Sequence, residues 1–379
     1  MLLLAVSAAD AQDTFATFRD ALWRDARDRG ISRATFDDAF AGVTPDPRVV
    51  AATKRQPEYG KPFGDYVVAM ASPSRIAQGR LKAKEWNDTF VALDKTYGVD
   101  RATILSIWGI ETSYGGAKDR WDVIRSLATL AHARYRDPYF RDELLASLRI
   151  LEDGHIARVD LLGAWAGAMG QPQFMPSSFL NYAVDFSGDG KNDIWRNVPD
   201  VLASIANYMR KSGWQSGLPW GFEVTLPAGF DTRRSRGTFA EWTTLGVRRA
   251  GGGKLPGAGD AILFFPSGVT GPAYLVTANF DVIKRYNNSD VYALAVAHLA
   301  DRIAGGGPFQ AKWPADDRQF TRDERIALQT RLRALGHPVS NLTGHFDFEL
   351  RDVIRTVQAK FGMTVDGHPT PALLGRLAP

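Results

Sequence analysis

The stretch GVDRATILSIWGIETSYGG, residues 98–116, decides how this chain folds. Asp100 is placed to cap a helix at its N-terminus, and the glycine pair at the far end of the stretch stops that helix. Apolar side chains from Ile104 to Trp108 recur at helical spacing and form one buried stripe. Glu111 continues this stripe, so the face that the helix buries also carries an acid.

An acid on an apolar helix face is unusual, and Glu111 also lies near the C-terminus of its helix, beside Trp108. Desolvation and the negative end of the helix dipole both disfavour the ionised carboxylate. The sequence therefore predicts a pKa of Glu111 above the ordinary range, which suits a general acid near neutral pH. The alternative is a structural Glu paired with a buried Arg or Lys.

A second segment, AGAMGQPQFMPSS at residues 166–178, combines glycines, two amides and soft apolar side chains. Amide groups beside aromatic residues suit the recognition of sugar hydroxyl and acetamido groups. The alternative is a tight connection that only packs between helices.

A third segment, DFSGDGKND at residues 185–193, is an acidic loop. Oxygen-bearing side chains stand at the first, third, fifth and ninth loop positions and Gly at the sixth, as in the first part of an EF-hand. Arg196 occupies the twelfth position, where an EF-hand has Glu, and Asp200 could replace it if the loop bends back. The alternative is a turn held by its own Asp and Ser side chains.

Periodicity along the chain predicts a mainly α fold with one small sheet. Helical patterns run from residue 14 to about 208, and short β-prone runs at 222–226 and 261–265 indicate a small β-rich part at about 214–270. Helical periodicity resumes at 291–299. The Gly- and Pro-rich residues 305–319 then predict a linker to a separate domain at 320–379.

Composition excludes several classes of protein. With 379 residues, 45% hydrophobic and 23% charged, the chain is neither disordered nor fibrous. Its net charge of +4 is too small for the dense basic face that nucleic acids require, so we expect no nucleic-acid partner. The absence of cysteine excludes disulfides, thiolate metal sites, Cys nucleophiles and a Cys-linked lipid anchor.

The N-terminal residues 1–11, MLLLAVSAADA, hold a short apolar run followed by a small-x-small pattern. We interpret them as a truncated signal peptide, which predicts an exported, periplasmic protein. The alternative is a short N-terminal helix that is retained.

The three motifs at residues 108–115, 166–178 and 185–190 resemble, in this order, those of the lytic murein transglycosylase B family, glycoside hydrolase family 103. The resemblance implies a lysozyme-like helical catalytic core within residues 12–304. It further implies non-hydrolytic cleavage of the β-1,4 bond between N-acetylmuramic acid and N-acetylglucosamine in peptidoglycan. Glu111 is then the single acid/base: it protonates the glycosidic oxygen, then deprotonates the C6 hydroxyl of the muramic acid, which leaves a 1,6-anhydro end. Asp119 and Asp122 remain possible helpers.

The same resemblance assigns further site residues. Substrate contacts carry over to Gln173, Met175, Tyr208, Tyr286, Asn287, Tyr292 and Tyr66. A structural calcium ion carries over to Asp185, Ser187, Asp189, the carbonyl of Lys191, and Asp200. No cofactor is expected for the chemistry. Ala164 departs from the family, which often has a Ser there that hydrogen-bonds the catalytic carboxylate.

The C-terminal residues 320–379 resemble the peptidoglycan-binding domain type 1, a module of three short helices. Val357 replaces the usual Phe, and the loop at 344–347 is degenerate, so a helical module without wall affinity is the alternative. The expected partners are peptidoglycan glycan strands and cell-wall synthesis or division complexes. A muramidase that uses water, or a non-catalytic wall-binding scaffold, remain alternatives for the whole chain.

Overall fold

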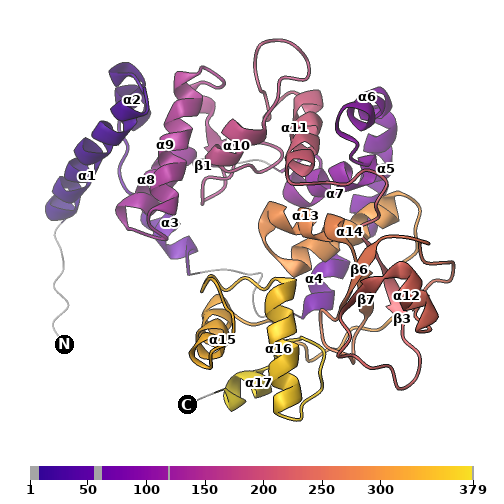
Figure 1. The fold of residues 1–379 in the computed structure, drawn as a ribbon. Coiled ribbons are helices and arrows are strands. Elements are labelled where there is room, and N and C mark those ends of the chain that lie inside the picture. The colour runs from indigo at the N-terminus through magenta and orange to yellow at the C-terminus, as the bar shows by residue number, and fades with distance from the viewer. Residues whose placement is uncertain (1–7, 55–61, 118–119, 378–379) are drawn as a thin grey trace. The chain divides into compact units, whose positions relative to one another are not determined.

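The structure, a computed structural model, describes residues 8–54, 62–117 and 120–377. The chain divides into two compact units, one formed by residues 1–56 and 107–211 and the other by residues 57–106 and 212–379. Helices predominate in both units, which confirms the predicted fold class (Figure 1).

Most of the expected signal peptide, residues 1–7, lies outside the described residues, and helix α1 begins at Ala8. Within the described residues, no helix has both the length and the hydropathy that crossing a bilayer requires.

Helix α7 (Arg101–Thr112) is the helix predicted from residues 98–116, and the boundary between the two units falls within it. Asp100 caps it as expected, because its carboxylate accepts hydrogen bonds of 2.8 Å from both the backbone N–H and the hydroxyl of Thr103. The apolar stripe through Ile104 and Trp108 is buried, with Trp108 only 1% exposed. Local spacing was therefore enough to predict this helix and its buried face.

The first unit is a helical body with one two-stranded ribbon. Its other elements are α1 (Ala8–Asp28), α2 (Arg33–Phe40), α3 (Pro47–Ala52), β1 (Trp121–Asp122), α8 (Val123–His132), α9 (Tyr139–Glu152), η1 (Arg158–Asp160), β2 (Leu162–Gly163), α10 (Pro176–Tyr182) and α11 (Val198–Lys211). Helices α8 and α9 pack side by side, burying Leu127 and Leu144 completely (Figure 1). Strand β1 pairs antiparallel with β2, which ties the start of α8 to the loop that follows Gly163.

The second unit surrounds a small antiparallel sheet. Its remaining elements before residue 305 are α4 (Phe63–Met70), α5 (Pro73–Glu85), α6 (Asn87–Tyr97), β3 (Gly221–Thr225), β4 (Arg236–Thr238), α12 (Phe239–Thr244), β5 (Arg248–Arg249), β6 (Asp260–Phe264), β7 (Ala273–Val276), α13 (Ala278–Asn287) and α14 (Asp290–Ile303). The strand order is β4-β6-β7-β3-β5. Strands β3 and β6 each begin one residue before the predicted β-prone run. One face of the sheet buries Trp242 of α12 against Leu263 and Leu275.

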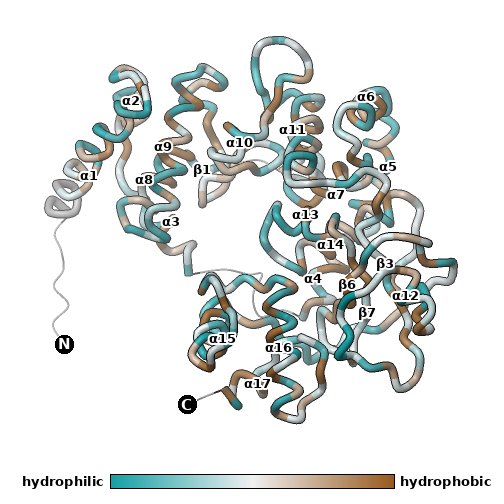
Figure 2. The backbone as a smooth tube through the Cα atoms, in the orientation of Figure 1, coloured by the Kyte–Doolittle hydropathy of each residue, from teal (hydrophilic) through white to brown (hydrophobic). Residues whose placement is uncertain are grey.

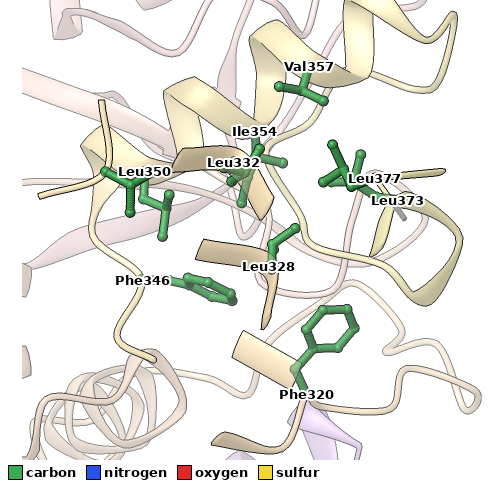
Figure 3. Packing of buried hydrophobic residues seen from close by; sticks show 10 residues of the cluster. Phe320, Leu328, Leu332, Phe346, Leu350, Ile354, Val357, Leu373 and Leu377 are labelled. Atoms are coloured by element: carbon green, nitrogen blue, oxygen red, sulfur yellow. The ribbon is translucent and has the colours of Figure 1, made fainter. Parts of the chain in front are cut away.

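The C-terminal module, residues 320–377, consists of the three predicted helices α15 (Arg322–Ala334), α16 (Phe348–Lys360) and α17 (Pro371–Arg376). In Figure 2 the tube of α15 and α16 alternates between hydrophobic and hydrophilic colours, as expected of helices with one buried face. Figure 3 shows the core of the module, where Leu328 and Leu332 of α15 meet Ile354 of α16 and Leu373 of α17.

The segment that joins the C-terminal module to α14 is packed against the second unit. Phe309 stacks on His298 with ring centroids 3.8 Å apart, and Trp313 stacks on Phe63 of α4 at 5.5 Å. A Cβ atom at Gly64 would lie only 2.2 Å from the Trp313 ring, so glycine permits this contact. Residues 305–319 therefore attach the module closely to the unit.

We predict that Gly64→Ala destabilises the protein by about 1–3 kcal/mol, because the added methyl group displaces the Trp313 ring from α4. Gly375→Ala is the matched control, since among the described residues no atom outside its chain neighbours and its own helix backbone lies within 4 Å of its Cβ position. Thermal and denaturant unfolding followed by tryptophan fluorescence measures both. Equal stability of the two variants would contradict the packing of Trp313 on Gly64.

Candidate active site

Glu111 lies in the last turn of α7 and is half-buried. Helix α7 ends at Thr112, the next residue, because Ser113 and Tyr114 adopt left-handed φ angles of 51° and 60°. The Tyr114 ring folds back over Gly109, where a Cβ atom would lie 2.6 Å from it, and meets Trp108 edge-on with centroids 5.5 Å apart. Glycine at 109 thus allows a tight reversal that fixes the turn next to Glu111.

Gln171 joins the end of α7 to the glycine- and glutamine-rich loop. Its Oε1 accepts the indole N–H of Trp108 at 2.8 Å, and its Nε2 donates to the carbonyl of Trp195 at 3.0 Å. Its backbone carbonyl accepts the hydroxyl of Thr112 at 2.8 Å. A Cβ atom at Gly115 would lie 2.4 Å from Gln171 Oε1, so this glycine makes room for the amide. The helix turn that carries Glu111 and the loop that carries Gln173 are therefore directly bonded.

Gln173 and Met175 lie two and four residues after Gln171. Met169 and Phe174 exchange backbone hydrogen bonds of 2.8 and 3.0 Å, which closes the loop into a tight turn. Gln173 sits at its tip with a left-handed φ of 52°, and its amide donates to the carbonyl of Gly170 at 2.9 Å. Met175 is the N-cap residue of α10 and is half-buried.

Glu143 on α9 holds the start of α10, a role that we did not predict from the sequence. It is 3% exposed, and its carboxylate accepts both the backbone N–H and the hydroxyl of Ser177, at 2.8 and 2.7 Å. Burial raises its pKa, although the two bonds from Ser177 oppose the shift. The sequence carried the same signal as for Glu111, because Glu143 also lies on an apolar stripe, between Phe140 and Leu144.

Tyr208 of α11 belongs to an aromatic cluster of the first unit. Its ring lies 5.8 Å from Phe174 and 4.4 Å from Tyr182 between centroids, and it is half-buried. The cluster connects α11 to the loop of Gln173.

Four of the predicted substrate residues lie in the second unit. Tyr286 and Asn287 end α13, and Tyr292 lies in the first turn of α14. The Tyr286 and Tyr292 rings are nearly parallel, with centroids 6.3 Å apart and an interplanar angle of 8°. Tyr292 is 2% exposed and supports the half-buried Tyr286, whereas Asn287 is exposed. Tyr66 of α4 is half-buried.

The acidic loop bends back onto the first turn of α11. As a result the carboxylates of Asp185, Asp189 and Asp200 lie within 4.8 Å of one another. Asp200 has no exposed surface, and its carboxylate accepts backbone N–H groups of Phe186, Ser187 and Asp193 at 2.9–3.1 Å. Burial raises the pKa of Asp200, and these backbone donors counteract the shift only in part.

The remaining predicted ligands surround this acidic cluster. The Ser187 hydroxyl donates to Asp185 at 3.3 Å, and the backbone N–H of Lys191 donates to Asp189 at 3.0 Å. Arg196, which stands where an EF-hand has its closing Glu, pairs instead with Asp160 at 2.9 Å. The loop is therefore closed by an acid from α11.

Comparison with protein families identifies two domains in the chain. A model of the transglycosylase SLT domain matches residues 14–301, and a model of a putative peptidoglycan binding domain matches residues 321–377. The chain is 33% identical over 239 residues to membrane-bound lytic murein transglycosylase B of Escherichia coli (strain K12). This match covers 62% of the chain and spans 65% of the length of that relative.

Two similar solved structures cover different shares of the chain. SltB3 from Pseudomonas aeruginosa in complex with NAG-anhNAM-pentapeptide is 45% identical, covers 96% of this chain and 99% of its own, and has a TM-score of 0.86. The Escherichia coli lytic transglycosylase Slt35 in complex with calcium is 28% identical, covers 77% of this chain and 92% of its own, and has a TM-score of 0.65.

We predict that Gln171→Ala lowers the free energy of unfolding by about 1–3 kcal/mol, since it leaves the buried Trp108 indole N–H and the Trp195 carbonyl without their partner. Gln310→Ala is the matched control, because the exposed Gln310 amide donates to the carbonyl of Pro308, two residues before it. Urea unfolding compares the two. If both variants lose equally little stability, the Gln171 amide does not hold the loop against α7.

Proposed function

Because this chain belongs to the transglycosylase SLT family, we propose that it is a lytic transglycosylase of peptidoglycan. The substrate is the β-1,4 bond between N-acetylmuramic acid and N-acetylglucosamine, and the product carries a 1,6-anhydromuramic acid end. The anhydro sugar bound to the related SltB3 supports this product.

The observation that carries the proposal is the set of hydrogen bonds that Gln171 makes with α7. These bonds attach the last turn of α7, which bears a half-buried carboxyl group, to a tight loop of amide and apolar side chains. An acid held in a fixed, partly desolvated position beside sugar-binding groups is the arrangement that general acid catalysis of glycoside cleavage needs.

We propose that Glu111 acts in both steps. Its carboxyl proton passes to the glycosidic oxygen while the bond from that oxygen to the anomeric carbon of muramic acid breaks. The resulting carboxylate then removes the proton of the C6 hydroxyl, whose oxygen bonds to the anomeric carbon. Glu111 ends the cycle protonated, so the reaction consumes no water and needs no second carboxylate.

Of the two possible helpers of Glu111, Asp122 already has structural partners, which supports a mechanism with one carboxylate. Asp122 caps α8 by accepting the backbone N–H of Arg125 at 3.0 Å, and it pairs with Arg158 at 2.7 Å. Asp122 thus already has a structural task. Asp119 lies outside the described residues.

The other site residues follow from the same proposal. Gln173, Met175 and Tyr208 contact glycan, as do Tyr66, Tyr286 and Asn287. Tyr292, which is 2% exposed, acts on substrate binding through its support of Tyr286. The C-terminal module binds the wall and keeps the enzyme near its insoluble substrate by raising the effective concentration. We also propose a periplasmic location and association with cell-wall synthesis or division complexes.

We propose a structural calcium site in the acidic loop. Three clustered carboxylates, with the Ser187 hydroxyl bonded to one of them, offer oxygen donors of the kind that Ca²⁺ prefers, and the Lys191 carbonyl is the further ligand that we propose. A cation there would also offset the cost of burying the Asp200 carboxylate. The calcium bound to the related Slt35 supports this choice of metal.

We predict that the full chain releases 1,6-anhydromuropeptides from purified sacculi, and that Glu111→Gln lowers this rate by at least about 10²- to 10⁴-fold, because the amide neither donates nor removes the required protons. Mass spectrometry of the products measures both. Reducing ends in equal yield would indicate a muramidase. Undiminished wall binding without any cleavage would indicate a scaffold.

The matched control for Glu111→Gln is Glu85→Gln, a surface glutamate of α5 that pairs with the neighbouring Lys82 at 2.7 Å. It should retain full activity. Melting curves of both variants show whether the fold is intact, and substantial turnover by a folded Glu111→Gln would refute the assignment of Glu111.

We predict that millimolar Ca²⁺ raises the melting temperature, more than Mg²⁺ does, since an ion that binds only the folded state stabilises it. Asp189→Asn should remove this response with little effect on the ion-free protein, because Asp189 is exposed. Asp160→Asn, which removes a nearby charge outside the cluster, should keep it. A calcium response that is identical in Asp189→Asn and in the unaltered chain would exclude the site.

A further inference from the structure

A cluster of buried charges lies where the C-terminal module meets the turn between α13 and α14. Asp290, the first residue of α14, pairs with Lys284 of α13 and with Arg351 of α16, each at 2.7 Å. The three side chains are only 6–11% exposed. Burial opposes ionisation of Asp290, but the two cations outweigh it and hold its pKa at about 2. Buried charges of this kind are stable only while their partners stay in place.

The cluster lies beside the turn that bears the proposed substrate residues Tyr286 and Asn287. Helix α13 ends at Asn287, Asn288 follows with a left-handed φ of 50°, and Ser289 caps α14. Both Lys284 and Asp290 are thus within four residues of the Tyr286–Asn287 pair, one on each side of it.

The module holds this turn at two further points. The Nδ1 atom of His345 lies 3.2 Å from the carbonyl oxygen of Asn288, and the ammonium group of Lys284 donates to the carbonyl of Phe346. Together with the Arg351–Asp290 pair, these contacts connect the C-terminal module to α13, to the turn and to α14.

Arg351 is itself firmly held. Its guanidinium donates to the carbonyl of Gly367 at 3.1 Å and lies 4.8 Å from the centre of the Phe264 ring. Phe348 of the same helix meets Phe264 edge-on at 5.7 Å. Because Arg351 is anchored to both the module and strand β6, its position defines the position of Asp290.

We propose that the C-terminal module is a positioning element of the substrate site, in addition to a wall-binding one: Arg351, through Asp290, and His345, through Asn288, fix the turn that presents Tyr286 and Asn287 to the glycan. This inference rests on the proposed function. Arg351 and His345 are positioning residues, since they act through Asp290 and Asn288.

Activity on short substrates distinguishes two roles of the module: tethering the enzyme to the wall, and positioning the turn. A tether raises activity on insoluble wall alone, because a soluble tetrasaccharide of N-acetylglucosamine and N-acetylmuramic acid gains nothing from tethering. A positioning element affects binding of that tetrasaccharide as well, since a displaced side chain loses its contact with the substrate.

The test measures kcat and KM of the full chain on the soluble tetrasaccharide. We expect Arg351→Met to raise KM about tenfold, with kcat changed less than about threefold, and Arg351→Lys to recover part of the loss. Arg236→Met is the matched control: its exposed side chain pairs with Glu349 and Asp352 of the same module at 3.3 and 3.0 Å, and neither of these acids belongs to the turn. It should leave both constants unchanged.

His345→Ala keeps the inference testable if Arg351→Met does not fold, because it removes the contact with the Asn288 carbonyl while the buried charges of Lys284, Asp290 and Arg351 stay in place. We expect it to raise KM about threefold without a change in melting temperature. An unchanged KM in His345→Ala and in every folded Arg351 variant, with loss only on insoluble wall, would overturn the inference.

Hydrogen exchange separates this inference from the proposed function. The backbone amides of residues 286–292 should exchange faster in His345→Ala and Arg351→Met than in the unaltered chain, and equal exchange would overturn the inference whatever the activity. If the unaltered chain releases no anhydro product, the proposed function fails, and hydrogen exchange alone then decides whether the module holds the turn.

Discussion

The proposed active site depends on the hydrogen bonds of Gln171. One amide accepts the indole N–H of Trp108 and donates to the carbonyl of Trp195, while the backbone of the same residue binds Thr112. These partners would be left unsatisfied in a mostly buried environment if the loop moved away from α7. The position of the loop relative to Glu111 is therefore set by the requirement that buried polar groups be paired.

The same requirement explains the buried acids. Glu143 binds Ser177 and fixes the start of α10, Asp200 gathers the backbone of the acidic loop, and Asp290 joins Lys284 to Arg351. Each carboxylate has donors that account for its burial. Asp200 is itself a predicted calcium ligand, Asp290 lies two residues before Tyr292, and Glu143 binds Ser177, two residues after Met175. These structural acids therefore support the proposed sites.

The fold was largely predictable from local pattern, whereas the sites were predictable only in part. Asp100, the stripe up to Trp108 and the three C-terminal helices were confirmed because capping and helical spacing are local properties of the sequence. An acid on an apolar stripe, however, marked both Glu111 and Glu143. Nothing local distinguishes them, because the partner of Glu143 is Ser177, 34 residues further along the chain.

The pair of glutamines illustrates the same limit. The motif at 166–178 indicated that both amides are important but did not distinguish them. Only the structure shows that Gln171 binds Trp108 and that Gln173 lies at the tip of the loop. Similarly, the sequence alone suggested that Asp200 could close the acidic loop, and the fold brings its carboxylate to within 4.8 Å of Asp185 and Asp189.

By itself, the sequence determined the helical class, the small sheet, the C-terminal module and the motifs that relate the chain to its family, because each is encoded by spacing within a short window. Only the tertiary structure decided which acids are structurally paired and that the C-terminal module holds the turn after α13. The physical reason is that these contacts join residues far apart in the chain, as Asp290 and Arg351 are, 61 residues from each other. Such pairs form only when folding removes both charges from water together.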